Sequence, residues 1–88
     1  MKKISQKGYT CGQEEVMSML ELYKPQTKTM LIKMAHELRD RSIRTYPNSF
    51  KPTLWGYGYR LGVCDGLLNY ENDHLKKNVN KLNESKMD

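Results

Sequence analysis

The chain has 88 residues, a net charge of +5 and a hydrophobic content of 38%. At this length folding buries only roughly 60 to 65% of the surface of the unfolded chain, so we expect one domain spanning residues 1–88, without a deep catalytic cleft. No apolar run is long enough to cross a membrane, and no apolar stretch follows Met1 that would serve as a signal peptide. We therefore expect a soluble, cytoplasmic protein.

The first helix is expected from about residue 11 to residue 24. Residues 1–9 are polar and are predicted to form a flexible arm. Thr10 and Gln13 have the spacing of a capping box, which favours a helix start at this point. The apolar residues of this segment that share one helical face are Val16, Leu20 and Tyr23.

The second helix is expected from about residue 27 to residue 45. Pro25 breaks the first helix, and either Thr27 or Thr29 can cap the second. Pro47 ends it, because the residue before a proline avoids the helical region. The residues predicted to face inward at helical spacing are Leu31, Met34, Ala35, Leu38 and Ser42.

The stretch WGYGYRLGVCDG at residues 55–66 fits two periodicities. Alternate residues are apolar, as in a strand, and the final Asp-Gly then has the character of a hairpin turn. A strand here would have no strongly alternating partner elsewhere in the chain, whereas a helix continues the apolar spacing beyond the stretch. We therefore predict a third helix from about residue 53 to residue 82, capped by Thr53, with a frayed tail at residues 83–88.

The predicted third helix has two apolar faces with a glycine strip between them. Each glycine costs a helix roughly 0.8 to 1 kcal/mol relative to alanine, so four glycines need a packing reason. Gly58, Gly62 and Gly66 recur every fourth residue and form a floor on which another helix backbone can pack closely. One face holds Leu54, Tyr57, Leu61, Cys64 and Leu68, with Cys64 expected as a small buried residue, and the other holds Trp55, Tyr59 and Val63.

Part of this segment resembles a known small protein. The pattern W-x-x-G-[aromatic]-R-x-[small]-x-x-D is made by Trp55, Gly58, Tyr59, Arg60, Gly62 and Asp65. It is similar to the C-terminal helix of ribosome modulation factor, a family of small basic proteins that bind ribosomal RNA. The resemblance covers 11 of the 88 residues and implies a helix at this place, and we carry no function over from it.

These elements predict an all-α domain of three helices, in which the long, glycine-rich third helix packs across a hairpin formed by the first two. The leucines of the third helix recur every seven residues, at Leu54, Leu61, Leu68, Leu75 and Leu82. A helix of about 30 residues also extends beyond its shorter neighbours. We therefore expect a homodimer that forms through the third helix.

Arginine and aromatic residues support two different hypotheses about function. The four arginines, Arg39, Arg41, Arg44 and Arg60, lie within 22 residues and suit phosphate, an acidic protein surface or simply a solvated helix face. The leading hypothesis is a non-enzymatic binding protein, an inhibitor or adaptor of phage type, acting on a host or cellular protein. Its predicted contact residues are Trp55, Tyr57, Tyr59, Arg60, Arg41 and Arg44. The alternative is a nucleic-acid-binding regulator that uses the Arg39–Arg60 basic cluster.

Residues that could carry catalysis or bind a metal are few. Cys11 and Cys64 form no Cys-x-x-Cys pair, which favours reduced thiols over a disulfide framework, although the sequence also permits one bridge between them. HELRD at residues 36–40 lacks the second histidine of the zincin helix motif, because Asp40 stands in its place. We therefore predict no enzyme activity, no metal site and no cofactor.

Overall fold

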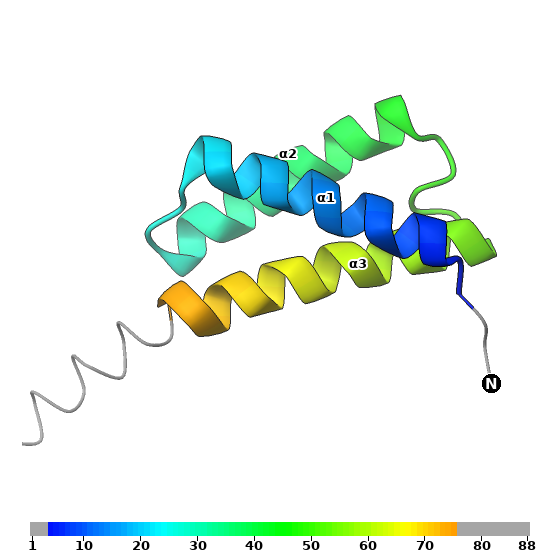
Figure 1. Cartoon of the computed structure of the whole chain (residues 1–88). Coiled ribbons are helices and arrows are strands. Elements are labelled where there is room, and N and C mark those ends of the chain that lie inside the picture. Colours follow the sequence, from blue (N-terminus) through cyan, green and yellow to red (C-terminus); the bar gives the residue numbers. More distant parts are fainter. Residues whose placement is uncertain (1–3, 76–88) are drawn as a thin grey trace, which may run out of the picture.

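The structure is a computed structural model that describes residues 4–75. These residues form three α-helices, α1 (Gln6–Tyr23), α2 (Lys28–Thr45) and α3 (Leu54–Tyr70), followed by a short π-helix, η1 (Glu71–Leu75). Helices α1 and α3 lie side by side and run in the same direction (Figure 1). Helix α2, which connects them in sequence, runs in the opposite direction. Residues 4–75 contain no strand, so the prediction of an all-α, three-helix domain is confirmed.

Helix α1 begins at Gln6, which corrects the predicted start near residue 11. Ser5 caps it, because its side-chain oxygen accepts a hydrogen bond from the backbone N–H of Gly8 at 3.1 Å. Thr10 consequently lies inside the helix instead of capping it, and the predicted flexible arm at residues 1–9 is wrong from residue 6 onward.

Helix α2 has the bounds that the sequence indicated. Thr27 is its N-cap and accepts a hydrogen bond from the backbone N–H of Met30 at 3.2 Å. The helix ends at Thr45, two residues before Pro47, as the restriction on residues before proline requires. Of the stripe predicted to face inward, Ala35 is half-buried and the others are buried: Leu31, Met34, Leu38 and Ser42.

Helix α3 begins at Leu54, capped by Thr53, whose hydroxyl accepts from the backbone N–H of Gly56 at 2.9 Å. Residues 55–66 are therefore helical, as the predicted helix and the resemblance to ribosome modulation factor both imply. The α-helical geometry ends at Tyr70, where η1 takes over. The remainder of the predicted helix to residue 82 and the predicted tail at residues 83–88 lie outside the described residues.

Glycines on both helices bring the backbones of α1 and α3 into contact. A Cβ atom at Gly58 would overlap the carbonyl oxygen of Ser5, and one at Gly62 would overlap that of Tyr9. The contact is reciprocal, because a Cβ atom at Gly12 would overlap the carbonyl oxygen of Tyr59. Two helices with glycines at this four-residue spacing can approach more closely than side chains would allow.

The small core lies where the three helices meet. Its buried apolar residues are Val16, Met19, Leu31, Met34, Leu38, Tyr59, Val63 and Leu75. The end of α3 is held to the α1–α2 loop by Tyr70, whose hydroxyl donates to the carbonyl oxygen of Pro25 at 2.6 Å. Within the described residues no helix is long and apolar enough to cross a membrane.

Candidate functional site

The face of α3 that points into the molecule is filled by an aromatic cluster. The Trp55 ring stacks on the Tyr59 ring with centroids 5.2 Å apart, and Tyr46 and Phe50 each lie 6.0 Å from Tyr59. Tyr59 is fully buried, and its hydroxyl is hydrogen-bonded to the Ser42 side chain. The prediction that Tyr59 contacts a partner is therefore wrong, since the residue belongs to the core. Trp55 is half-buried in the same cluster.

The opposite face of α3 carries a line of exposed apolar residues, which we call the leucine stripe: Leu54, Tyr57, Leu61, Cys64 and Leu68. The three leucines expose 61%, 44% and 54% of their surface, respectively. Cys64 was expected to be a small buried residue, and it is exposed instead. Only one of the two apolar faces of α3 is thus covered by residues 4–75.

The stripe ends at Leu68, which corrects the prediction that its phase continues through Leu75. Leu75 is buried in the core, on the other side of the helix from its predicted partners. The cause is η1. One turn of a π-helix contains more residues than one turn of an α-helix, so the side chains that follow point in a different direction from the one that a continuous α-helix would give them. Leu82, the last leucine of the predicted repeat, lies outside the described residues.

Two groups of opposite charge flank the leucine stripe. On one side the Arg60 guanidinium lies over the Tyr57 ring, 5.0 Å from its centroid, and the buried Nε of Arg60 has no hydrogen-bond partner within residues 4–75. On the other side Asp65 accepts a hydrogen bond from the Tyr9 hydroxyl at 2.5 Å. This bond raises the pKa of Tyr9, because losing the proton would place a second negative charge beside the carboxylate.

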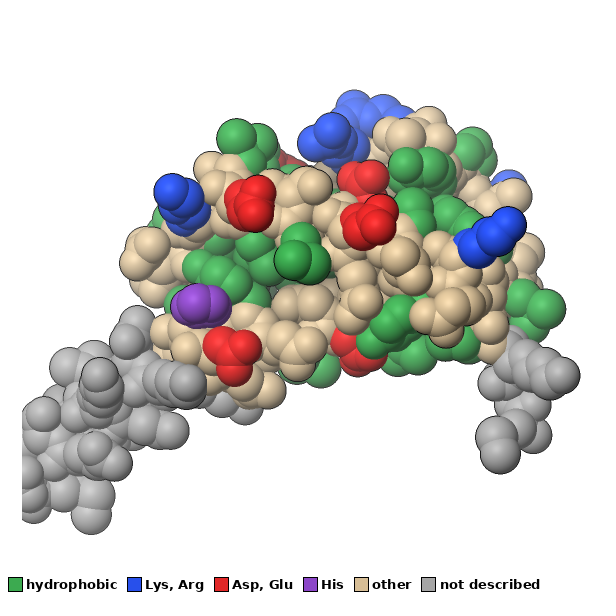
Figure 2. Space-filling view, viewed as in Figure 1, with side chains coloured by type: hydrophobic (Ala, Val, Ile, Leu, Met, Phe, Trp, Pro, Cys, Tyr) green, Lys and Arg blue, Asp and Glu red, His purple; other side chains and the backbone are tan. Residues whose placement is uncertain are grey.

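The arginines that are close in sequence lie in separate places in the fold. Arg39 packs over the Phe50 ring at 5.8 Å, whereas Arg60 lies on α3 beside the stripe. Arg41 and Arg44 line a hollow of about 330 Å³ between α1 and α2. Two carboxylates share that hollow, Glu37 and Asp40. On the face shown in Figure 2, the Lys and Arg side chains (blue) stand in separate groups and do not merge into one patch.

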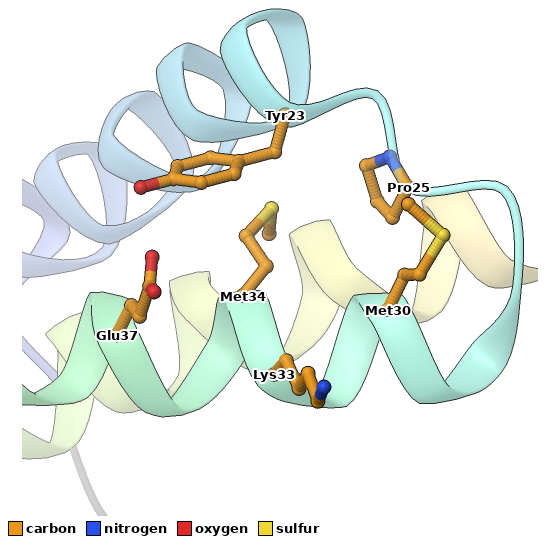
Figure 3. Close-up of a pocket in the computed structure, with 6 residues that line it drawn as sticks. All are labelled: Tyr23, Pro25, Met30, Lys33, Met34 and Glu37. Carbon is orange, nitrogen blue, oxygen red and sulfur yellow. The ribbon is translucent and has the colours of Figure 1, made fainter.

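A second hollow, of about 230 Å³, lies where α1 meets the start of α2 (Figure 3). Its walls are mostly apolar, and its lining residues are Tyr23, Pro25, Met30, Lys33, Met34 and Glu37. The Tyr23 hydroxyl lies toward Glu37, and this carboxylate raises the pKa of Tyr23. This pair separates the apolar hollow from the charged one, since both residues line each of them.

The two cysteines are both free thiols in the structure. Cys11 is half-buried, and burial raises the pKa of its thiol, which favours the less reactive protonated form. Among residues 4–75 no three His, Cys, Asp or Glu side chains are grouped so that they could hold a metal ion.

Some important residues were missed from the sequence. Gly8 and Gly12 pack against α3 and have the same four-residue spacing as the glycines of α3, a signal that was hidden when Gly8 was assigned to a flexible arm. Leu61 and Leu68 were placed on an apolar face of the third helix and in its heptad pattern but were not predicted as contact residues, yet they lie at the centre and the end of the exposed stripe. Comparisons of the chain with protein-family models, with curated proteins and with solved structures found no match.

Proposed function

We propose that the protein is a non-enzymatic binding protein, an inhibitor or adaptor, and that the leucine stripe of α3 is its protein-binding surface. The observation that carries this proposal is the exposure of five aligned apolar side chains on a helix whose other face is already buried. A helix that is apolar all round is normally enclosed on all sides. Contiguous exposed apolar surface of this kind marks interaction sites in monomeric proteins.

The chemistry of the stripe favours a protein over a nucleic acid. Its members are three leucines, a tyrosine and a cysteine, and a single arginine, Arg60, stands beside them. Phosphate contacts require several cations on one surface. Arg41 and Arg44 are exposed, but the neighbouring Glu37 and Asp40 offset their attraction for phosphates.

This proposal revises the contact residues predicted from the sequence. Tyr57 and Arg60 stay in the proposed surface, and Leu54, Leu61 and Leu68 join them. Arg41 and Arg44 lie on the α1–α2 side and are left out. The cytoplasm remains the proposed compartment, because both cysteines are free thiols and reducing conditions keep them so.

A capture experiment with matched variants tests this function. The tagged protein serves as bait, with nuclease added, and the captured polypeptides are compared for wild type, Leu61→Glu and Leu22→Glu. Leu22 is the control because it is an exposed leucine on α1, outside the stripe. We expect Leu61→Glu to abolish capture, since a charge at the centre of an apolar interface must be desolvated, and Leu22→Glu to retain it.

Substitutions of Arg41 and Arg44 test the alternative, a nucleic-acid partner. If the partner were a nucleic acid, capture would disappear with nuclease, and Arg41→Ala or Arg44→Ala would each weaken binding and flatten its salt dependence by about one unit. That result, together with normal capture by Leu61→Glu, would overturn the proposed protein-binding surface.

A further inference from the structure

We propose that the occupant of the leucine stripe is a second copy of this chain, docked in parallel so that the two stripes face each other. This inference rests on the proposed function, because it takes the same surface and names its partner. Three properties of the described residues support it: the spacing of the stripe, the charges beside it, and the rigid mounting of α3 on α1.

The spacing of the stripe is that of a self-complementary seam. Leu54, Leu61 and Leu68 are seven residues apart, and Tyr57 and Cys64 each follow a leucine by three residues. In heptad terms the leucines occupy a positions, and Tyr57 and Cys64 occupy d positions, which is the pattern that packs knobs into holes against an identical helix. All five side chains are exposed, so no rearrangement of the fold is needed to bring two stripes together.

The flanking charges select both the partner and its orientation. In the same heptad, Arg60 is at position g and Asp65, five residues later, is at position e. In a parallel pair of helices, a g residue lies beside the e residue of the next heptad on the other chain. Arg60 of each copy would therefore meet Asp65 of the other. In an antiparallel pair, g faces g and e faces e, and these two charges would not meet.

Arg60 and Asp65 can each form this additional ion pair. Within residues 4–75, Arg60 forms no ion pair with a carboxylate, and its guanidinium lies over the Tyr57 ring. Asp65 is half-buried and accepts one hydrogen bond, from Tyr9 to its Oδ2. A carboxylate has room for about four such bonds, so it can accept one from a guanidinium as well.

The size of the seam sets the expected strength of the dimer. From Leu54 to Leu68 the stripe spans about 21 Å at a rise of 1.5 Å per residue, which is only about two heptads. The glycine contacts with α1 already hold α3 in place, so association costs little further conformational entropy. The seam is nevertheless short, and we expect a weak dimer with a dissociation constant in the micromolar range, about that of a small, transient interface.

Light scattering over a concentration series tests self-association. The mass should rise from 10.4 kDa toward twice that value as the concentration passes through the micromolar range. Leu61→Glu should raise the dissociation constant by about tenfold or more, and Leu22→Glu should leave it unchanged. A constant monomer mass for the wild type up to about 1 mM would overturn the proposal.

A mixing experiment tests the parallel orientation. Arg60→Glu alone places two Glu–Asp pairs across the seam, and Asp65→Arg alone places two Arg–Arg pairs there, so each variant by itself should be a weaker dimer than the wild type. In an equal mixture both cross-chain pairs have opposite charges, and a mixed dimer should form at concentrations where neither variant associates alone. Failure of the mixture to associate would exclude this arrangement.

Cysteine cross-linking provides an independent check of the orientation. In a parallel seam the two Cys64 thiols lie at the same level, whereas in an antiparallel seam centred on Leu61 each lies opposite a Tyr57. In a Cys11→Ser background, oxidised glutathione should join the two Cys64 thiols in a disulfide and release reduced glutathione, and Leu61→Glu should suppress the product. A dimer by light scattering that yields no Cys64 disulfide would contradict the parallel arrangement.

The outcomes separate this inference from the proposed function. A chain that stays monomeric, yet captures a different polypeptide that Leu61→Glu no longer captures, would overturn the dimer and leave the binding surface intact. A chain that dimerises through the stripe and captures no other polypeptide would support the dimer and overturn the role as an inhibitor or adaptor. A chain that stays monomeric and captures nothing through the stripe would overturn both.

Discussion

The two faces of α3 differ in what covers them, although both are apolar. The inner face combines glycines with Trp55 and Tyr59 and is sealed against α1 and the aromatic cluster. The outer face carries the leucine stripe and is exposed. Side-chain size accounts for the difference, because the glycines let the α1 backbone approach one side, while leucines on the other side hold neighbours at side-chain distance. Apolar character alone therefore does not tell which face of a helix makes the core.

A substitution at the glycine contact between α1 and α3 should affect the inner face of α3 most strongly. Gly62→Val places a branched side chain where the carbonyl of Tyr9 lies, so α1 and α3 must separate. We expect a loss of about 3 kcal/mol in the free energy of unfolding, measured by urea denaturation. Leu61→Val, at the neighbouring exposed position, is the control and should cost less than about 1 kcal/mol. An equal loss of unfolding free energy in the two variants would mean that the inner and outer faces of α3 contribute equally to stability.

The buried hydroxyl pair gives the next largest effect. Tyr59→Phe leaves the Ser42 hydroxyl buried without its partner, which should cost about 1 to 2 kcal/mol of stability. Adding Ser42→Ala to Tyr59→Phe should restore part of this loss, because the unpaired group is removed. Ser18→Ala removes an exposed hydroxyl from α1 and should be nearly neutral. If the double variant is no more stable than Tyr59→Phe alone, the result would argue against a hydrogen bond between the Ser42 and Tyr59 hydroxyls.

Alkaline pH should lower the stability of the fold by ionising Tyr59 on the inner face of α3. Burial raises the pKa of Tyr59, so the unfolded chain releases this proton at a lower pH than the folded chain does. The contribution to stability is therefore complete below about pH 10, the ordinary tyrosine value, and falls as the pH rises through the folded pKa. Urea denaturation between pH 8 and pH 11 should show this decline, and Tyr59→Phe should make it shallower. An unchanged slope in Tyr59→Phe would contradict the assignment.

The outer face should give the smallest effect on the folded monomer. Leu61 is exposed and does not belong to the buried core cluster. At protein concentrations below the micromolar range, Leu61→Glu should change the free energy of unfolding by no more than about 0.5 kcal/mol. Circular dichroism during thermal unfolding would measure this, with Leu22→Glu as the matched control. A loss above about 1.5 kcal/mol would place Leu61 in the core instead.

The sequence was sufficient to predict the helices and their caps where local chemistry decides them. Thr53 precedes its helix without a competing signal, and of the two candidates for the second helix, Thr27 and Thr29, Thr27 is the N-cap. Thr10 also had a capping pattern, but Ser5 caps α1 earlier, and the contact of Gly8 with α3 supports the extra turn. Local pattern fails there because a contact between residues far apart in sequence outweighs it.

The division of α3 into two apolar faces was also predictable from helical spacing, but the choice of the inner face was not. Tyr59 could equally have pointed outward, and only its bond to Ser42 and the approach of α1 show that it belongs to the core. The π-turn that turns Leu75 inward leaves no clear signal in the sequence, because it reflects packing of the helix end and not a residue preference. The arginine cluster likewise dispersed once the helices were folded.

The urea midpoint, measured as a function of protein concentration, tests the separate roles of the two faces most directly. If α3 folds through its inner face and associates through its outer one, the wild-type midpoint rises with concentration, because association stabilises the folded state. The Leu61→Glu midpoint should be independent of concentration and equal to the wild-type value at high dilution. A Leu61→Glu midpoint well below that value, or a wild-type midpoint that does not change over a hundredfold range of concentration, would contradict this division.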